Sequence, residues 1–148
     1  MSILNQLNED MKTAMRAKDK DSLTTIRMIK SAIQNEEIRK GSELNQDEEI
    51  AIVSREKKQR LESLNEFEKA ERDDLVEKLN RELEIVNKYL PEQLAEDEVR
   101  GIVNETINEV GAESMQDMGK VMSTIMPKVA GRADGGTINK LVREELSK

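Results

Sequence analysis

The apolar residues of this chain recur at intervals of three and four residues along its whole length, and they never alternate with polar ones. A repeat near 3.6 residues places side chains on one face of an α-helix, whereas alternation would place them on one face of a strand. A clear example is the run Leu75, Leu79, Leu83, Val86 and Leu90. The pattern therefore predicts an all-α protein without a β-sheet.

The material for a core is almost entirely aliphatic. Aromatic residues make up 1% of the chain and charged residues 37%, a balance that favours helices with wide solvated faces. No stretch approaches the roughly 18 apolar residues needed to span a bilayer, and the first residues contain no apolar signal core. These features predict a cytoplasmic protein that makes no contact with membranes.

The chain contains neither cysteine nor histidine. Disulfides, thiolate nucleophiles, zinc sites built from Cys and His, and Ser–His–Asp triads are therefore excluded. Carboxylate and lysine chemistry remain possible, but no nucleophile stands beside a suitable base. We predict no catalytic residue, no cofactor and no metal site, and we interpret the acidic residues between 66 and 77 as solvated.

Helix-start and helix-stop signals divide the pattern into segments. We expect a first helix over 2–18, a second from Asp21 or Ser22 to Gly41, and a third over 46–70 that begins with a capping box of Asn45 and Glu48. A second capping box, Asp74 with Glu77, starts a fourth helix. The short break before it predicts an antiparallel hairpin with the third helix.

Two basic residues of the third helix, Lys57 and Arg60, fall close to its expected buried face. Their stems can cover apolar surface while their charged groups reach water. The alternatives are a basic patch or ion pairs with the acidic helix that follows.

Pro91 disfavours helical geometry at the preceding residue and marks a boundary. We predict a four-helix N-terminal domain over 1–92 and a small three-helix C-terminal domain over 93–148. The C-terminal domain should contain a helix over 96–110, a Met-rich helix that Pro127 disturbs, and a last helix capped by Asp134. Ala95 stands where a hydroxyl cap would be expected.

The net charge of −7 argues against a protein that coats nucleic acid, but it conceals a gradient. Residues 111–148 contain six Lys or Arg and five Asp or Glu, a balance of +1, whereas residues 1–110 contain eighteen and twenty-six, a balance of −8. Any contact with RNA should therefore be local and C-terminal.

Two features of the C-terminal stretch have both a structural and a functional interpretation. A methionine stripe at 115, 118, 122 and 126 can be core, or it can be an adaptable binding groove. The run 131–136, Gly-Arg-Ala-Asp-Gly-Gly, can be turn and cap chemistry. It can equally leave the backbone N–H groups of a helix start open to an anion.

The same stretch is similar to a known family. Two runs resemble the C-terminal signature of the YqeY family: Asp117-Met118-Gly119-Lys120-Val121-Met122 and Gly131-Arg132-Ala133-Asp134-Gly135. The similarity continues upstream in Lys58-Gln59-Arg60-Leu61-Glu62-Ser63, in Phe67 to Leu75, and in Tyr89-Leu90-Pro91-Glu92-Gln93-Leu94. That family is related to the tail domain of the B subunit of tRNA-dependent amidotransferases.

The resemblance implies a non-catalytic accessory module that contacts tRNA, or a component linked to a carbon–nitrogen ligase that uses glutamine as amido donor. A helical protein-interaction module is a further alternative. The partners implied are tRNA and a tRNA-charging or amidotransferase component. With almost no aromatic residues to stack on bases, recognition should be of backbone and shape. The candidate RNA-binding residues are Lys120, Lys128, Arg132, Gly135, Gly136, Lys140 and Arg143.

Overall fold

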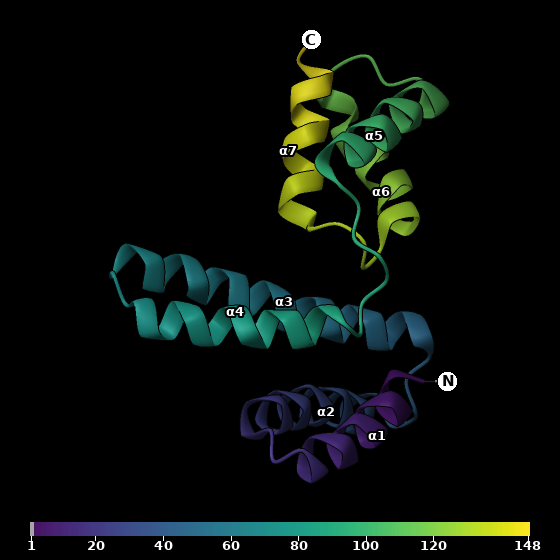
Figure 1. The fold of residues 1–148 in the computed structure, drawn as a ribbon. Helices are drawn as coiled ribbons and strands as arrows, with labels where there is room; N and C mark the ends of the chain where they lie inside the picture. Colours follow the sequence, from purple (N-terminus) through teal and green to yellow (C-terminus); the bar gives the residue numbers. More distant parts are fainter. Residues whose placement is uncertain (1) are drawn as a thin grey trace. The chain divides into compact units, whose positions relative to one another are not determined.

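The computed structural model describes residues 2–148, which fold into seven α-helices and one short 3₁₀ helix without any β-strand (Figure 1). The chain forms two compact units, Met1–Pro91 and Glu92–Lys148. The first contains α1 (Ile3–Arg16), α2 (Lys20–Lys40), α3 (Gln46–Lys69) and α4 (Asp73–Asn87). The second contains α5 (Glu96–Val110), η1 (Met115–Asp117), α6 (Met118–Val129) and α7 (Gly135–Leu146). The all-α prediction is confirmed, and the assignment of two separate domains stays a prediction.

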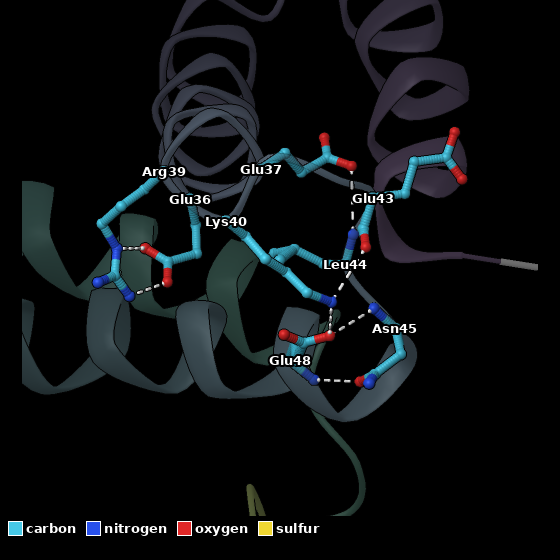
Figure 2. A network of polar contacts seen from close by, with 8 residues as sticks. All are labelled: Glu36, Glu37, Arg39, Lys40, Glu43, Leu44, Asn45 and Glu48. Atoms are coloured by element: carbon cyan, nitrogen blue, oxygen red, sulfur yellow. Dashed lines mark hydrogen bonds and ion pairs between the residues drawn. The ribbon is translucent and has the colours of Figure 1, made fainter.

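The connection between α2 and α3 forms as the sequence predicts. Gly41 ends α2 with a φ of 84°, in the left-handed region that glycine adopts without strain. The side chain of Asn45 accepts a hydrogen bond from the N–H of Glu48 (2.8 Å), and the Glu48 carboxylate accepts one from the N–H of Asn45 (3.1 Å). Figure 2 shows that Lys40 reaches the same carboxylate, at 2.7 Å. The predicted capping box is confirmed.

Other helix starts differ from the prediction. The cap of α2 is Asp19, whose carboxylate accepts the N–H of Ser22, so this helix begins before the predicted cap at Asp21 or Ser22. The capping box predicted at Asp74 is wrong, because α4 begins at Asp73 after Arg72. The oxygens of Asp74 instead accept hydrogen bonds from the Arg72 guanidinium, at 3.2 and 3.3 Å. Asp74 therefore lies inside the first turn of α4, where its carboxylate pairs with Arg72.

The core of the first unit joins all four of its helices. Its largest fully buried side chains include Leu7, Ile29, Ile33, Val53 and Val86. Glu49 of α3 is also buried, with 2% of its surface exposed, and its two carboxylate oxygens accept the N–H groups of Ile3 and Leu4. A carboxylate favours a helix N-terminus, so this side chain fastens the start of α1 to α3.

Arg60 resolves the alternatives left open for the basic residues of α3. Its side chain is 6% exposed and lies between two carboxylates, Glu56 of the preceding turn at 2.9 Å and Glu82 of α4 at 3.7 Å. The ion-pair interpretation therefore holds for Arg60. This contact ties the two helices of the hairpin together, where the apolar seam of α3 is interrupted.

The second unit packs α5, α6 and α7 around aliphatic side chains, which are Val99, Val103, Val121, Ile125, Val129, Ile138, Leu141, Val142 and Leu146. The methionine stripe lies at the edge of this core. Met118 and Met122 pack against it only partly, and Met115 and Met126 are 42% and 41% exposed. Pro127 does not break the helix, since α6 continues to Val129. A proline so close to the C-terminus disturbs only the last turn.

Candidate nucleic-acid interface

The turn between α6 and α7 holds the segment that follows Pro91. Gly131 has a φ of 73°, and its carbonyl accepts a hydrogen bond from the side-chain amide of Gln93 at 2.7 Å. The carbonyl of Arg132 accepts the N–H of Leu94 at 2.8 Å. Gly131 and Arg132 therefore have a structural role, because their carbonyl groups anchor the chain that enters α5.

The Arg132 side chain lies beside this anchor and is half-buried. Its Nε atom donates to the carbonyl of Glu92 at 3.5 Å. This contact engages only one edge of the guanidinium. No carboxylate within residues 2–148 forms an ion pair with it, so its charge is not neutralised locally.

The start of α7 carries its own negative charge. Asp134 caps the helix, and its Oδ2 atom accepts the N–H of Thr137 at 3.3 Å. A Cβ atom on Gly136 would lie 3.1 Å from the same oxygen, whereas one on Gly135 would meet nothing within 4 Å. An anion at this helix start would meet the Asp134 carboxylate. Gly136 gives that cap room, and Gly135 leaves the outer surface open.

The two lysines of α6 differ in their contacts. The ammonium group of Lys128 donates to a carboxylate oxygen of Glu109 and to the hydroxyl of Thr106, the latter at 3.2 Å. Lys120 is exposed and forms no ion pair within residues 2–148. Lys128 therefore ties α6 to α5, and Lys120 is the cation of this helix that stays available.

Gly136, Lys140 and Arg143 follow i, i+4, i+7 spacing on α7 and form one stripe, which we call the α7 stripe. All three are exposed, because the opposite face of the helix buries Ile138, Leu141 and Val142. Neither Lys140 nor Arg143 has an ion-pair partner among the residues that the structure describes. The stripe begins four residues after Arg132, at the same end of the helix.

The carboxylates next to the α7 stripe are held by other cations. Glu144 would be an i+4 partner for Lys140, but it pairs with Arg100 of α5 at 3.1 Å. Glu145 is bound by Lys148 at 2.9 Å and by Arg100 at 2.7 Å, and these contacts lower its pKa. Arg100 therefore leaves the charges of Lys140 and Arg143 without local compensation. This contact could not be read from the amino-acid sequence, because its partners lie more than forty positions apart.

Taken as a whole the second unit is acidic, since residues 92–148 contain seven Lys or Arg and eleven Asp or Glu. A cationic surface can therefore only be local. Within residues 2–148 no cluster of acidic side chains is arranged to hold a metal ion. Nor does any helix in that range have the length and apolar character to cross a bilayer.

Comparison with known proteins identifies the class. The family model for Yqey-like protein matches residues 4–146, so the chain belongs to the YqeY family. It is 31% identical over 146 residues to "Altered inheritance of mitochondria protein 41, mitochondrial" of Pyrenophora tritici-repentis, covering 96% of this chain and 80% of that protein. The Clavispora lusitaniae protein of the same name is 37% identical over 114 residues, covering 75% and 66%. The Saccharomyces cerevisiae protein is 42% identical over 85 residues, covering 57% and 46%.

The prediction of a cytoplasmic protein is contradicted by these relatives, since each is named as mitochondrial. The reason for the error is physical. A missing apolar signal core argues only against secretion, and a missing apolar span only against a membrane helix. Neither criterion bears on import into mitochondria, which uses amphipathic segments without an apolar core.

Proposed function

We propose that this protein is a non-catalytic module that binds the phosphate backbone of folded tRNA through its C-terminal unit. The binding surface consists of the α7 stripe and Arg132, with Lys120 as an outlying contact. The observation that carries the proposal is the charge arrangement on α7. Lys140 and Arg143 are exposed and unpaired, while Arg100 holds the neighbouring carboxylates. The names of the relatives favour a mitochondrial setting.

The chemistry of the surface suits phosphate better than bases. Lysine and arginine donate hydrogen bonds to phosphate oxygens, and these contacts position a protein on RNA without reading sequence. With an aromatic content of 1%, the chain has almost nothing on which a base could stack. Gly136 adds no side chain to the stripe, and the attraction for phosphate comes from Lys140 and Arg143, since the Asp134 carboxylate lies beside Gly136. The α7 stripe would therefore recognise the shape of tRNA.

The module would supply no catalytic group of its own. The relation of the family to an amidotransferase tail domain favours a role beside an enzyme that acts on charged tRNA, such as a carbon–nitrogen ligase. Purification of the tagged protein in the presence of nuclease distinguishes two forms of this role. Retention of a ligase component without RNA supports a direct protein contact, and its loss supports a contact through tRNA.

A charge-reversal experiment tests RNA binding. Fluorescence anisotropy with labelled folded tRNA should show weak binding by the parent protein at low salt. With three cations engaged at ~0.9 counterions per phosphate, a plot of log K against log salt should have a slope of about −2 to −3. The variant Lys140→Glu/Arg143→Glu should lose most of this affinity, since both cations are replaced by anions.

A matched control lies on α3. Arg55 and Lys58 have the same i, i+3 spacing, are exposed, and form no ion pair within the described residues. Reversal of both to Glu changes the net charge by the same amount and should leave most of the binding. Equal losses in the two double variants would show a non-specific charge effect and would contradict the proposal. So would a parent protein that fails to bind tRNA at low salt.

A further inference from the structure

A recess in the first unit lies between α1, α2 and the end of α4. Its volume is about 270 Å³. The floor is apolar and buried, formed by Ala14, Ile26, Ile85 and the ring of Tyr89. The rim carries three charged side chains, Asp10, Asp19 and Lys88. Small-molecule sites commonly combine an apolar floor with a few polar groups, and at about 270 Å³ this recess has room for a ligand smaller than a drug-sized molecule.

The Asp10 carboxylate on the rim is held in position through one of its two oxygens. The hydroxyl of Tyr89 donates to Oδ2 of Asp10 at 2.5 Å, from a side chain that is 7% exposed. Burial and this hydrogen bond both raise the pKa of the phenol, which therefore stays protonated and keeps donating. The other oxygen of Asp10, Oδ1, accepts no hydrogen bond within residues 2–148. It is available to a cationic group.

The other two charged groups on the rim, Asp19 and Lys88, differ in the hydrogen bonds that they form. Asp19 already accepts hydrogen bonds from the hydroxyl and the N–H of Ser22, at 2.7 and 3.1 Å, as the cap of α2. These bonds, helped by the more distant Lys88, lower the pKa of Asp19. The ammonium group of Lys88 forms no hydrogen bond or short ion pair within the described residues. It is available to an anionic group.

We propose that this recess binds a small zwitterion of the α-amino acid class with an aliphatic side chain. The ligand's ammonium group binds Oδ1 of Asp10, its carboxylate binds Lys88, and its side chain covers Ile26 and Ile85. A simple amine would use only Asp10, and a simple carboxylate only Lys88. The pairing of one available anionic and one available cationic group on the rim of an apolar recess is what selects a molecule that carries both charges.

Isothermal titration calorimetry with the full chain tests the proposal, with leucine as the probe. Two analogues isolate the charges: 3-methylbutylamine lacks the carboxylate, and 4-methylpentanoate lacks the ammonium group. Leucine should bind, and each analogue should bind at least tenfold more weakly. The variants Asp10→Asn and Lys88→Met should each weaken leucine binding at least tenfold.

Each variant should also bind leucine and one of the two analogues with equal affinity. In Asp10→Asn, leucine should bind no better than 4-methylpentanoate, and in Lys88→Met no better than 3-methylbutylamine. The same charge changes placed away from the recess, Asp47→Asn and Lys78→Met, should leave leucine binding intact. Circular dichroism shows whether each variant is folded. The proposal is overturned if leucine and the other aliphatic amino acids fail to bind at millimolar concentration, or if neither recess variant weakens binding.

Discussion

The two units of this protein differ in how fully they bury charged side chains. The first buries two charged side chains, Glu49 at 2% exposure and Arg60 at 5%, and gives each of them partners on other helices or turns. In the second unit the only buried polar residue is Thr106, whose hydroxyl donates to the carbonyl of Ile102 within the same helix. Polar contacts also join helices of the second unit, but their cations are partly exposed, Arg100 by 33% and Lys128 by 34%. The first unit therefore encloses its charges more fully than the second.

This difference explains where each unit can carry a functional surface. In the second unit Arg100 pairs with Glu144 and with Glu145, whose side chain is 7% exposed, and the cations of the α7 stripe stay at the surface. In the first unit several charges are committed to holding helices together. Lys88 beside the recess is exposed and takes part in no such contact within the described residues.

The largest effect is expected from Arg60→Ala. Its removal leaves Glu56 and Glu82, whose side chains are each 14% exposed, without a counter-charge. Breaking a buried ion pair by removing one partner costs about 3–5 kcal/mol. Urea unfolding followed by the fluorescence of Tyr89, the only tyrosine and a residue of the first unit, measures the loss.

Replacement of Glu56, Arg60 and Glu82 together tests whether the ion pairs themselves stabilise the fold, or whether the loss in Arg60→Ala comes from two carboxylates left without a partner. The triple variant Glu56→Leu/Arg60→Met/Glu82→Leu should recover most of the stability, because apolar packing often replaces a buried ionic group without loss. Arg72→Ala is the control, since it removes an exposed pair, and it should change stability little. If Arg60→Ala is no worse than Arg72→Ala, the first unit does not depend on buried charge.

An intermediate effect is expected from Ile125→Ala in the second unit. Ile125 is fully buried, and its truncation should cost about 2–5 kcal/mol. Met126→Ala is the matched control on the next position of the same helix, and its side chain is 41% exposed, so its loss should be much smaller. Thermal unfolding followed by circular dichroism compares the two. Similar losses would mean that the methionine edge contributes as much as the aliphatic core.

The local features of the fold were largely predictable from the sequence. Helical periodicity, the capping box of Asn45 and Glu48, and the glycine ends at Gly41 and Gly111 depend on neighbouring residues, so each is readable from a short stretch. The capping box predicted at Asp74 does not form, because α4 begins one residue earlier and the Asp74 carboxylate pairs with Arg72. On α6 both the methionine stripe and the Val121–Ile125–Val129 stripe have helical spacing, and the structure fully buries the second while Met118 and Met122 pack against it partly buried.

The candidate site was predictable only in part. Arg132, Lys140 and Arg143 were predicted from their charge and position and stay a proposal, whereas the engagement of Lys128 by Glu109 depends on how α5 and α6 pack. The same holds for Arg100, whose two partners on α7 are distant in the sequence. The recess of the first unit was missed entirely. Asp10, Asp19 and Lys88 come together only through the packing of three helices.

The smallest effect, and the only gain, is expected from Ala95→Ser at the start of α5. Ala95 has the extended geometry of a cap, and its N–H already donates to the Glu98 carboxylate at 3.1 Å, which is one half of a capping box. A serine hydroxyl would accept the N–H of Glu98 and complete it, for about 1 kcal/mol. Ala95→Val lacks that acceptor and should give no gain. Since α5 belongs to the second unit, urea unfolding should show the shift in circular dichroism while the Tyr89 signal of the first unit stays in place. If both signals shift together, the two units unfold as one cooperative body, and the contrast between them is one of composition and not of independent stability.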